Sequence, residues 1–163
     1  MKYSKCILLA ASLAMVPSMA GAQAVVTERS ISLDAARELA NTALESCRKS
    51  GYKVSITVLN RAGRTAVVLH DSGANPHTIE NSLRKAYTSL SFRRPSGEFG
   101  KQMASTPPPH AAILLDKVTS GEGGLPIMSN KEVIGAVGIS GAPGGHLDTA
   151  CAQAGIDKIA GGL

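Results

Sequence analysis

The stretch GGLPIMSNKEVIGAVGISG, residues 123–141, carries the strongest indication of the fold class. Its apolar segments 126–128 and 132–139 predict two strands, and Asn130-Lys131 between them predicts a turn. Glycines inside a strand indicate that another group approaches the backbone closely. That group is either a ligand or a neighbouring chain, or it is a helix packed tightly on the sheet. The stretch is neither a Walker loop nor a dinucleotide-binding fingerprint, because no helix follows at the required spacing.

A helix and a hairpin are predicted on the N-terminal side of this stretch. Ser32 is a suitable helix N-cap, and Gly51 suits the residue that follows the helix C-terminus. Between them, apolar residues recur at helical spacing along one face. They are Ala36, Leu39, Ala40, Ala43, Leu44 and Cys47. The alternating, β-branched segments 54–59 and 65–70 then predict a β-hairpin with its turn at residues 60–63.

A second helix is predicted between the two hairpins. Thr78 can cap it, and it must end before Pro95, because the residue that precedes a proline disfavours the helical conformation. Its predicted inward-facing residues are Ile79, Leu83, Ala86, Tyr87 and Leu90. Residues 96–106 fit either a loop or a short helical turn, and residues 113–115 fit a short strand.

The last helix is predicted from about residue 147 to residue 160. Its predicted inward-facing residues are Leu147, Ala150, Cys151 and Ala154. The order is therefore helix, two strands, helix, about three strands, helix, without the strand–helix alternation of a doubly wound fold. This order predicts a single α+β domain, residues 23–163, in which helices flank an antiparallel sheet.

Residues 1–22 have the pattern of a secretory signal peptide. Two lysines give a positive start, residues 7–16 form an apolar core, and Ala-Gly-Ala at 20–22 fits a cleavage site. The apolar run is shorter than the roughly 20 residues that a helix needs to span a bilayer. We therefore predict a periplasmic or secreted protein whose mature chain, residues 23–163, has no membrane span.

The charge of the mature chain argues against a nucleic acid partner. The signal segment carries two of the 17 Lys and Arg residues and none of the 12 Asp and Glu residues, which leaves a formal charge of +3. No run of Lys or Arg exceeds two residues, and aromatic residues make up only 3% of the chain. Binding to nucleic acid needs a denser basic surface and aromatic side chains that stack on bases.

Side chains that bind a metal or a cofactor are few. Cys47 and Cys151 either form a disulfide in an oxidising compartment or stay as two buried thiols. The four histidines are His70, His77, His110 and His146. Their spacing forms no zinc-binding motif, so we predict no metal site. One histidine beside an apolar slot is still enough to bind haem iron, and the lack of a Cys-x-x-Cys-His motif means that such haem would be non-covalent.

Lys85 and Asp148 are the candidates for acid–base chemistry. Lys85 lies in the middle of the second predicted helix and off its apolar strip, where a lysine is usually solvated. Asp148 lies at the start of the last helix, where a carboxylate interacts favourably with the helix dipole. If the fold brings the two together, a buried lysine could act as a base or anchor a carboxylate.

Four segments, in this order, resemble the GlcG/HbpS family, the haem-degrading domain family that includes the C-terminal domain of PduO-type proteins. The segments are VLNRAG (58–63), RKAYT (84–88), GGLPI (123–127) and GAVGISG (135–141). Asp148 and the Cys-Ala pair at 151–152 also fit, whereas Asn60 stands where the family often has Asp. The resemblance implies a profilin-like fold, an antiparallel sheet flanked by helices, usually assembled as a homo-oligomer.

The resemblance also implies haem binding, but haem ligation differs between family members, so the candidate residues are chosen by their positions in this sequence. His77 is the first choice of haem ligand, followed by Tyr87 and His110, and Ser96 stands where the family often has a Thr that would contact haem. A glycine-walled ligand pocket would be formed by Lys85, Thr88, Gly124, Pro126 and Gly141. The alternative function is a small-molecule enzyme or accessory subunit that uses this pocket together with Asp148. A third alternative is a scaffold or partner-binding module without a ligand of its own.

Overall fold

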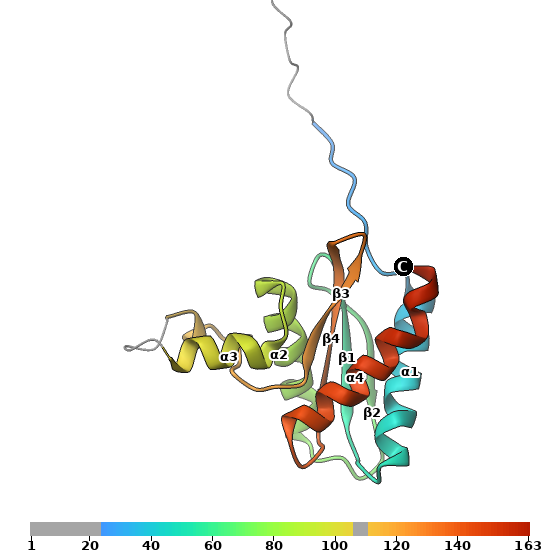
Figure 1. Ribbon diagram of the computed structural model, residues 1–163, viewed down its shortest axis with the longest axis vertical. Coiled ribbons are helices and arrows are strands. Elements are labelled where there is room, and N and C mark those ends of the chain that lie inside the picture. The colour runs from blue at the N-terminus through green and yellow to red at the C-terminus, as the bar shows by residue number, and fades with distance from the viewer. Residues whose placement is uncertain (1–23, 106–110) are drawn as a thin grey trace, which may run out of the picture.

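The computed structural model describes residues 24–105 and 111–163, which form an α+β domain (Figure 1). A four-stranded antiparallel sheet lies between helices that cover both of its faces. The predicted fold class, an antiparallel sheet flanked by helices, is therefore confirmed. The predicted signal peptide, residues 1–22, and the candidate haem ligand His110 lie outside the described residues.

The first helix, α1 (Leu33–Lys49), forms as its sequence predicts. Ser32 caps it, because its Oγ accepts a hydrogen bond of 3.2 Å from the backbone N–H of Ala35. Of the residues predicted to face inward, all are buried except Leu44, which is half-buried. Gly51 follows the helix with a φ of 79°, a conformation that glycine adopts without steric cost.

Both predicted hairpins are confirmed. The strands are β1 (Ser55–Asn60), β2 (Thr65–His70), β3 (Gly124–Ser129) and β4 (Glu132–Ser140). Their order in the sheet is β2-β1-β4-β3, so β1 and β4 are central and every neighbouring pair is antiparallel. Asn130 and Lys131 connect β3 to β4 with φ values of 50° and 67°, the pattern of a type I′ turn.

The start of α2 (His77–Phe92) differs from the prediction. Thr78 is not the N-cap: the helix begins at His77 with Pro76 at the N-cap position, and the Oγ1 of Thr78 donates a hydrogen bond of 2.6 Å to the backbone oxygen of Asn75. The helix ends before Pro95, as predicted. The ambiguous segment that follows is a nine-residue helix, α3 (Ser96–Ala104).

The strand predicted at residues 113–115 is wrong. Residues Ala111–Leu114 form a short 3-10 helix, η1. Ile113 packs there against the apolar cluster of Phe99, Met103 and Val118, which holds α3 to its neighbouring loop. Its apolar character therefore serves this small cluster and does not indicate a further strand.

The last helix, α4 (Gly145–Ile159), continues into a 3-10 turn, η2 (Ala160–Gly162). Among the residues predicted to face inward, Cys151 is buried, but Ala150 is exposed. The buried stripe runs instead through Ala152 and Gly155, which are small enough for α4 to lie close to α1. Leu147 and Ala154 are half-buried at the margin of this stripe.

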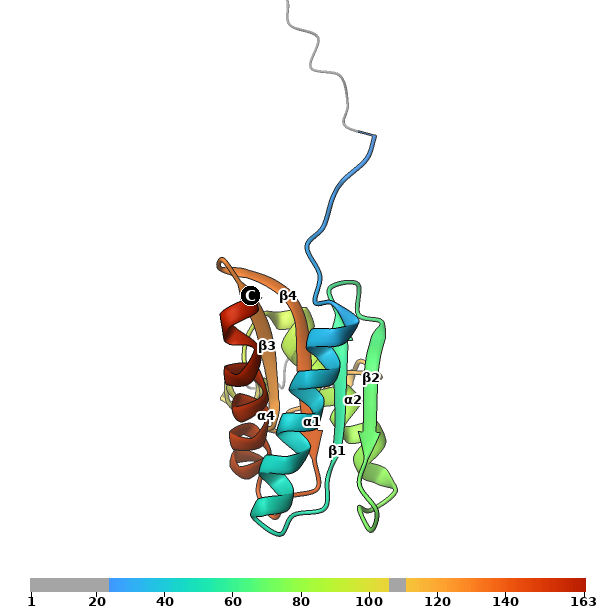
Figure 2. The same cartoon turned by 90° about the vertical axis from the view of Figure 1, so that its right-hand side faces the viewer.

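One face of the sheet, the apolar face, is covered by α1 and α4, which lie side by side (Figure 2). The sheet contributes buried residues that alternate along each strand, as expected for a strand with one face in the core. They include Ile56, Val58, Leu125, Ile127, Val137 and Ile139. A disulfide between Cys47 and Cys151 joins the two helices, and this pairing decides between the two alternatives left open by the sequence.

The opposite face is covered by α2 through a polar layer, which we define as Ser55, Thr57, Thr78 and Ser82. All four side chains are buried, and they pair across the interface. Ser55 shares a hydrogen bond of 2.7 Å with Thr78, and Thr57 shares one of 2.8 Å with Ser82. These bonds satisfy the hydroxyl groups that burial removes from water.

The predicted inward face of α2 is therefore partly wrong. Ala86 and Leu90 are buried, but Ile79 is 42% exposed, and Leu83 and Tyr87 are half-buried. The cause is Gly138 in β4, where an added Cβ would overlap the carbonyl oxygen of Ser82. Around Ser82 the helix backbone lies so close to the strand that only small side chains fit beneath it. Towards the C-terminal end of α2, Leu90 packs with Leu59 in a small apolar cluster. At Gly138, the group that approaches the strand is therefore a tightly packed helix and not a ligand or a neighbouring chain.

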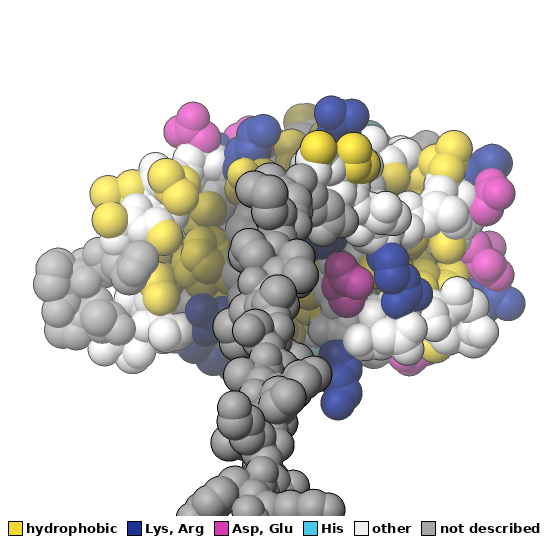
Figure 3. Space-filling model, turned by 90° about the horizontal axis from the view of Figure 1, so that it is seen from above, with side chains coloured by type: hydrophobic (Ala, Val, Ile, Leu, Met, Phe, Trp, Pro, Cys, Tyr) yellow, Lys and Arg dark blue, Asp and Glu magenta, His cyan; other side chains and the backbone are white. Residues whose placement is uncertain are grey.

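The surface mixes charged and apolar side chains. Seen from the end where the N-terminal segment leaves the domain, Lys and Arg, Asp and Glu, and hydrophobic side chains alternate over short distances (Figure 3). In the described part of the chain, no helix has the length and apolar character needed to cross a membrane.

Candidate functional site

Lys85 and Asp148 form a buried ion pair. The Nζ of Lys85 donates a hydrogen bond of 2.8 Å to Oδ2 of Asp148 and one of 2.9 Å to the backbone oxygen of Ile139. Their side chains are only 5% and 3% exposed. The expectation of a solvated lysine is wrong, because α2 turns this position toward the ends of β3 and β4. The arrangement required by the alternative function, Lys85 buried beside Asp148, is present.

Asp148 has a pKa above its ordinary value. Burial is the largest cause, because it disfavours the charged form, and Lys85 opposes this effect through its hydrogen bond and charge. The second carboxylate oxygen, Oδ1, accepts a hydrogen bond of 3.0 Å from the backbone N–H of Ala142. Asp148 lies in the first turn of α4. Its carboxylate therefore links α4 to α2 and to the residues that follow β4.

The loop before β3 closes over this pair. An added Cβ on Gly123 would lie 2.9 Å from Nζ of Lys85 and 2.8 Å from Cβ of Asp148. Gly123 has a φ of 124°, which favours glycine on its own. Gly121 also approaches the Lys85 side chain, at 3.4 Å from Cε to an added Cβ. The space around the amino group is thus filled by backbone.

Thr88 and Ser96 hold the same loop in place. The Oγ1 of Thr88 accepts a hydrogen bond of 3.0 Å from the N–H of Thr119, and the Oγ of Ser96 accepts one of 2.9 Å from the N–H of Gly124. Both side chains are fully buried. Two candidate residues from different predicted sets, one for the pocket and one for haem, therefore lie together and bind the protein backbone.

The other two candidates for the glycine-walled pocket lie elsewhere. Gly141 packs against the carbonyl oxygen of Lys53, which an added Cβ would overlap, and it precedes the amide that contacts Asp148. Pro126 lines a separate cavity of 420 Å³ between β3 and α4, with Met128 and Ile156 among its apolar walls. The structure thus brings Lys85, Thr88 and Gly124 together and separates Pro126 from them.

His77 is exposed at the first turn of α2. It lines an open cavity of 300 Å³ together with Glu80, Asn81 and Arg84. Arg84 is held by Glu80 in an ion pair of 2.5 Å. Tyr87, the second candidate ligand, lies further along the helix, half-buried, with the amino group of Lys117 5.5 Å from its ring centre.

An apolar groove of 340 Å³ adjoins the His77 cavity and shares Glu80 with it. Its walls come from β2 and from the side of α2 that the prediction placed inside, with Val68, Ile79 and Leu83 as the main apolar residues. The displaced apolar stripe of α2 therefore forms a surface groove. Hydrophobic periodicity located these residues correctly but assigned them to the core.

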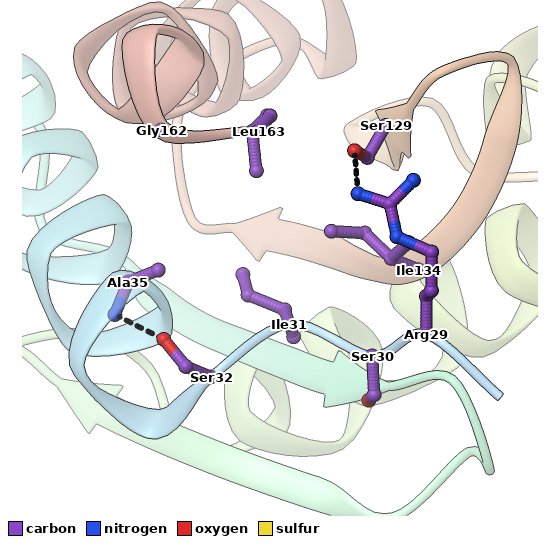
Figure 4. A pocket seen from close by; sticks show the side chains of 9 residues that line it. All are labelled: Arg29, Ser30, Ile31, Ser32, Ala35, Ser129, Ile134, Gly162 and Leu163. Carbon is purple, nitrogen blue, oxygen red and sulfur yellow. Dashed lines mark hydrogen bonds between the residues drawn. The ribbon is translucent and has the colours of Figure 1, made fainter. Parts of the chain in front are cut away.

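Two features of the structure were missed by the sequence. Arg48 donates two hydrogen bonds to Asp71, of 3.1 and 2.7 Å, and this lowers the pKa of the Asp71 carboxyl. A small cavity of 180 Å³ lies where the N-terminal segment meets η2 (Figure 4), and there Arg29 donates a hydrogen bond of 2.8 Å to Ser129. No local pattern marks either feature, because the partners are far apart in the sequence.

No cluster of three or more His, Cys, Asp or Glu side chains suited to a metal ion occurs in residues 24–105 and 111–163. His70 is engaged by a hydrogen bond of 2.8 Å between its Nδ1 and Oγ of Ser55. Of the histidines that the structure describes, His77 is the one that combines exposure with an adjacent apolar groove.

The fold and these motifs agree with the comparisons to known proteins. The family model described as "Haem degrading protein HbpS-like" matches residues 31–157, which is most of the chain. The chain therefore belongs to the HbpS-like family, and this membership supports a haem-related function. The resemblance inferred from the sequence is confirmed.

Three solved structures illustrate the likeness. The crystal structure of HbpS is 32% identical with a TM-score of 0.78, covering 82% of this chain and 93% of that one. The Klebsiella pneumoniae protein ORFY is 25% identical with a TM-score of 0.79, covering 85% and 96%. A complex of PduOC with haem is 23% identical with a TM-score of 0.73, covering 80% and 95%, and at this identity it shows the shared fold.

Proposed function

We propose that this chain is exported to the periplasm or beyond and there binds haem non-covalently. Membership of a family described as haem-degrading is the observation that carries the proposal. The complex of PduOC with haem adds that this fold can accommodate the group. Haem would supply a redox-active iron, and His77 and the residues around it would bind and orient the group.

The residues around His77 fit haem. A haem site needs one side chain that ligates iron and an apolar slot for the porphyrin. His77 offers an imidazole that is exposed, and the groove of Val68, Ile79 and Leu83 next to it offers apolar walls. Arg84 on the same cavity is paired with Glu80 through Nε and Nη2, which leaves its other N–H donors for a haem carboxylate. We therefore place the haem at the N-terminal half of α2.

The disulfide supports the export part of the proposal. Disulfides persist in oxidising compartments such as the periplasm and are rare in the cytosol. Cys47 and Cys151 are paired and buried, and residues 1–22 have the pattern of a cleavable signal. The two observations are independent, since one concerns the folded domain and the other the sequence of residues 1–22. The homo-oligomer is likewise proposed, with the exposed Leu114 and Leu115 in its support.

The test is a titration of the mature chain, residues 23–163, with hemin, followed by absorption spectroscopy. We expect a Soret band at one equivalent, and His77→Ala should shift this band and weaken binding about tenfold or more, since it removes an iron ligand. His146→Ala is the matched control, because His146 is also exposed but lies at the start of α4.

His110→Ala completes the experiment, since His110 is the remaining candidate histidine. A Soret band that is unchanged in these three variants and in His70→Ala would rule out histidine ligation, and the absence of any band would rule out haem binding. A shift in His110→Ala alone would move the ligand away from α2 and contradict the proposed site.

A small-molecule enzyme or accessory subunit built on Lys85 and Asp148 is the second candidate function. The burial of Lys85 against Asp148 is the observation that favours it. The two side chains line none of the cavities described above, and the glycine loop fills the space beside them. We therefore rank this function below haem binding.

A further inference from the structure

We propose that a further cavity, the hairpin-end cavity at the end of the sheet that carries both hairpin turns, binds a small ligand with a phosphate or carboxylate group. The cavity measures 360 Å³, a size typical of small-molecule sites. Its basic walls come from three separate loops: Arg61 from the β1–β2 turn, Arg93 from the end of α2 and Lys131 from the β3–β4 turn. This end of the domain faces the viewer in Figure 3.

The cavity has an excess of positive charge that the protein leaves unpaired. Glu132 is the acid on its wall, against the three cations. Within residues 24–105 and 111–163, the side chains of Arg61, Arg93 and Lys131 make no ion pair and no hydrogen bond. By contrast, Arg48 and Arg84 in the same fold are both paired with a carboxylate.

Arg61 shows in addition a buried donor without a partner. Its Nε is excluded from solvent and donates to nothing in the described structure. Buried polar atoms in proteins almost always have a hydrogen-bond partner, so an unpaired one requires an explanation. No protein acceptor therefore fixes the guanidinium of Arg61 in its present position, so a small side-chain rotation can turn its donors toward an oxyanion in the cavity.

The backbone gives a further, independent argument. Arg93 follows α2 in the left-handed conformation, with φ 54° and ψ 37°, and Lys131 is the second residue of the turn, with φ 67°. Glycine is the favoured residue at both kinds of position. At two places where the backbone favours glycine, the chain has instead a cation that borders the same cavity. The backbone at both positions would be more stable with glycine, so these two side chains are best explained by a contact with a ligand in the cavity.

The wall of the cavity defines the class of ligand. A guanidinium presents donors in a planar fork that matches the two oxygens of a carboxylate or phosphate. Met128 and Val133 form an apolar part of the same wall, so the ligand should carry an apolar group beside its anionic one. The site is distinct from the proposed haem site, since Arg93 and His77 lie at opposite ends of the 16-residue α2, about 24 Å apart along the helix.

The experiment measures binding of phenyl phosphate, benzoate and inorganic phosphate to the mature chain by calorimetry at constant ionic strength. Phenyl phosphate and benzoate distinguish the two oxyanions, and inorganic phosphate tests the apolar wall. Arg93→Gly and Lys131→Gly should each weaken the preferred probe about tenfold, because each removes a charged hydrogen-bond donor. Both should leave the melting temperature unchanged or raise it, because glycine relieves the backbone.

This combination of weaker binding and undiminished stability separates a binding role from a structural one. Arg37→Ala on α1 is the matched control: it removes one positive charge from an exposed position that does not line the cavity, and it should leave binding unchanged. Hemin binding should also be unaffected by the two glycine variants. The proposal is overturned if the wild type binds none of the three probes, or if Arg93→Gly and Lys131→Gly bind them as the wild type does.

Discussion

The apolar face and the α2 face of the sheet are attached to their helices by different interactions. On the apolar face, α1 and α4 pack through aliphatic side chains and are joined by the disulfide of Cys47 and Cys151. On the other face, α2 lies on the polar layer and is fixed at its middle by the ion pair of Lys85 and Asp148. Hydrophobic contact is non-directional, whereas hydrogen bonds and ion pairs require particular geometry.

This difference explains where substitutions should be tolerated. Packed apolar residues can exchange for others of similar volume at modest cost. A buried polar group has no such freedom, because removal of one partner leaves the other unsatisfied in a medium of low dielectric constant. The α2 face should therefore be the less tolerant of the two, although it buries fewer large side chains. The hydrogen bonds and the ion pair on this face also fix the orientation of α2. This helix carries His77 at one end and leads to Arg93 at the other.

The largest effect is expected on the apolar face, from removal of the disulfide. The cysteines are 104 residues apart, and the loss of a crosslink that closes a loop of this length is worth about 4 to 5 kcal/mol in the chain-entropy model. The double variant Cys47→Ala, Cys151→Ala should lose about this much free energy of unfolding, measured by urea denaturation. The wild type in reducing agent should unfold at a similar urea concentration. If both the variant and the reduced protein keep full stability, aliphatic packing alone holds this face.

The next largest effect is expected from Lys85→Met on the α2 face. The substitution leaves the Asp148 carboxylate buried without its cation, which should cost about 3 to 5 kcal/mol at neutral pH. The sign of the pH dependence follows from the raised pKa of Asp148. A group whose pKa is higher in the folded state makes folding less favourable as the pH rises from its unfolded value, about 4, through its folded value. Met also removes the opposing effect of Lys85, so the deficit of the variant should shrink on acidification.

Urea denaturation at pH 5 and pH 7.5 measures this dependence. The double variant Lys85→Met, Asp148→Asn is the control, because neither buried side chain then carries a charge. It should recover part of the lost free energy of unfolding, and this free energy should not depend on pH in the same way. An equal deficit of Lys85→Met at both pH values would mean that the carboxylate finds water or another cation, and the α2 face would then be less specific than we infer.

The sequence was sufficient to predict most of the fold. The α1 stripe, both hairpins and the turn at Asn130-Lys131 follow local rules of periodicity and turn chemistry, and the structure agrees with them. The inward face of α2 does not follow these rules. Its orientation depends on Gly138 and Gly124, which let the helix backbone approach the sheet, and this distance is a property of two segments far apart in the sequence.

The candidate site was predictable to a smaller extent for the same reason. Lys85 and Asp148 were identified as a pair of interest, but their contact depends on the positions of α2 and α4 around the ends of β3 and β4. The three cations of the hairpin-end cavity, Arg61, Arg93 and Lys131, gave no signal in the sequence. Each lies in a different loop, and a lone basic residue in a turn is usually solvated, so convergence on one cavity emerges only from the folded chain.

The smallest effects are expected from glycine to alanine substitutions, which test the comparison of the two faces at single positions. An added Cβ on Gly138 would overlap the carbonyl of Ser82 and lie 2.5 Å from the amide nitrogen of Ala86, so two backbone atoms of α2 would have to move. On the apolar face, an added Cβ on Gly155 would lie 2.6 Å from the carbonyl oxygen of Leu39 and otherwise meets side chains at 3.1 Å or more. Gly155→Ala therefore displaces one backbone atom of α1, whereas Gly138→Ala displaces two of α2, the nearer of them by more.

We therefore expect Gly138→Ala to cost about 1 to 3 kcal/mol, the usual range for overpacking, and Gly155→Ala to lie near the low end of that range. Gly161→Ala is the control, since nothing lies within 4 Å of its added Cβ, and it should stay within about 0.5 kcal/mol of the wild type. Thermal and urea denaturation rank the three. Equal costs at Gly138 and Gly155 would mean that α2 can lift from the sheet as easily as α4 shifts against α1, and the polar layer would then not be what fixes the helix.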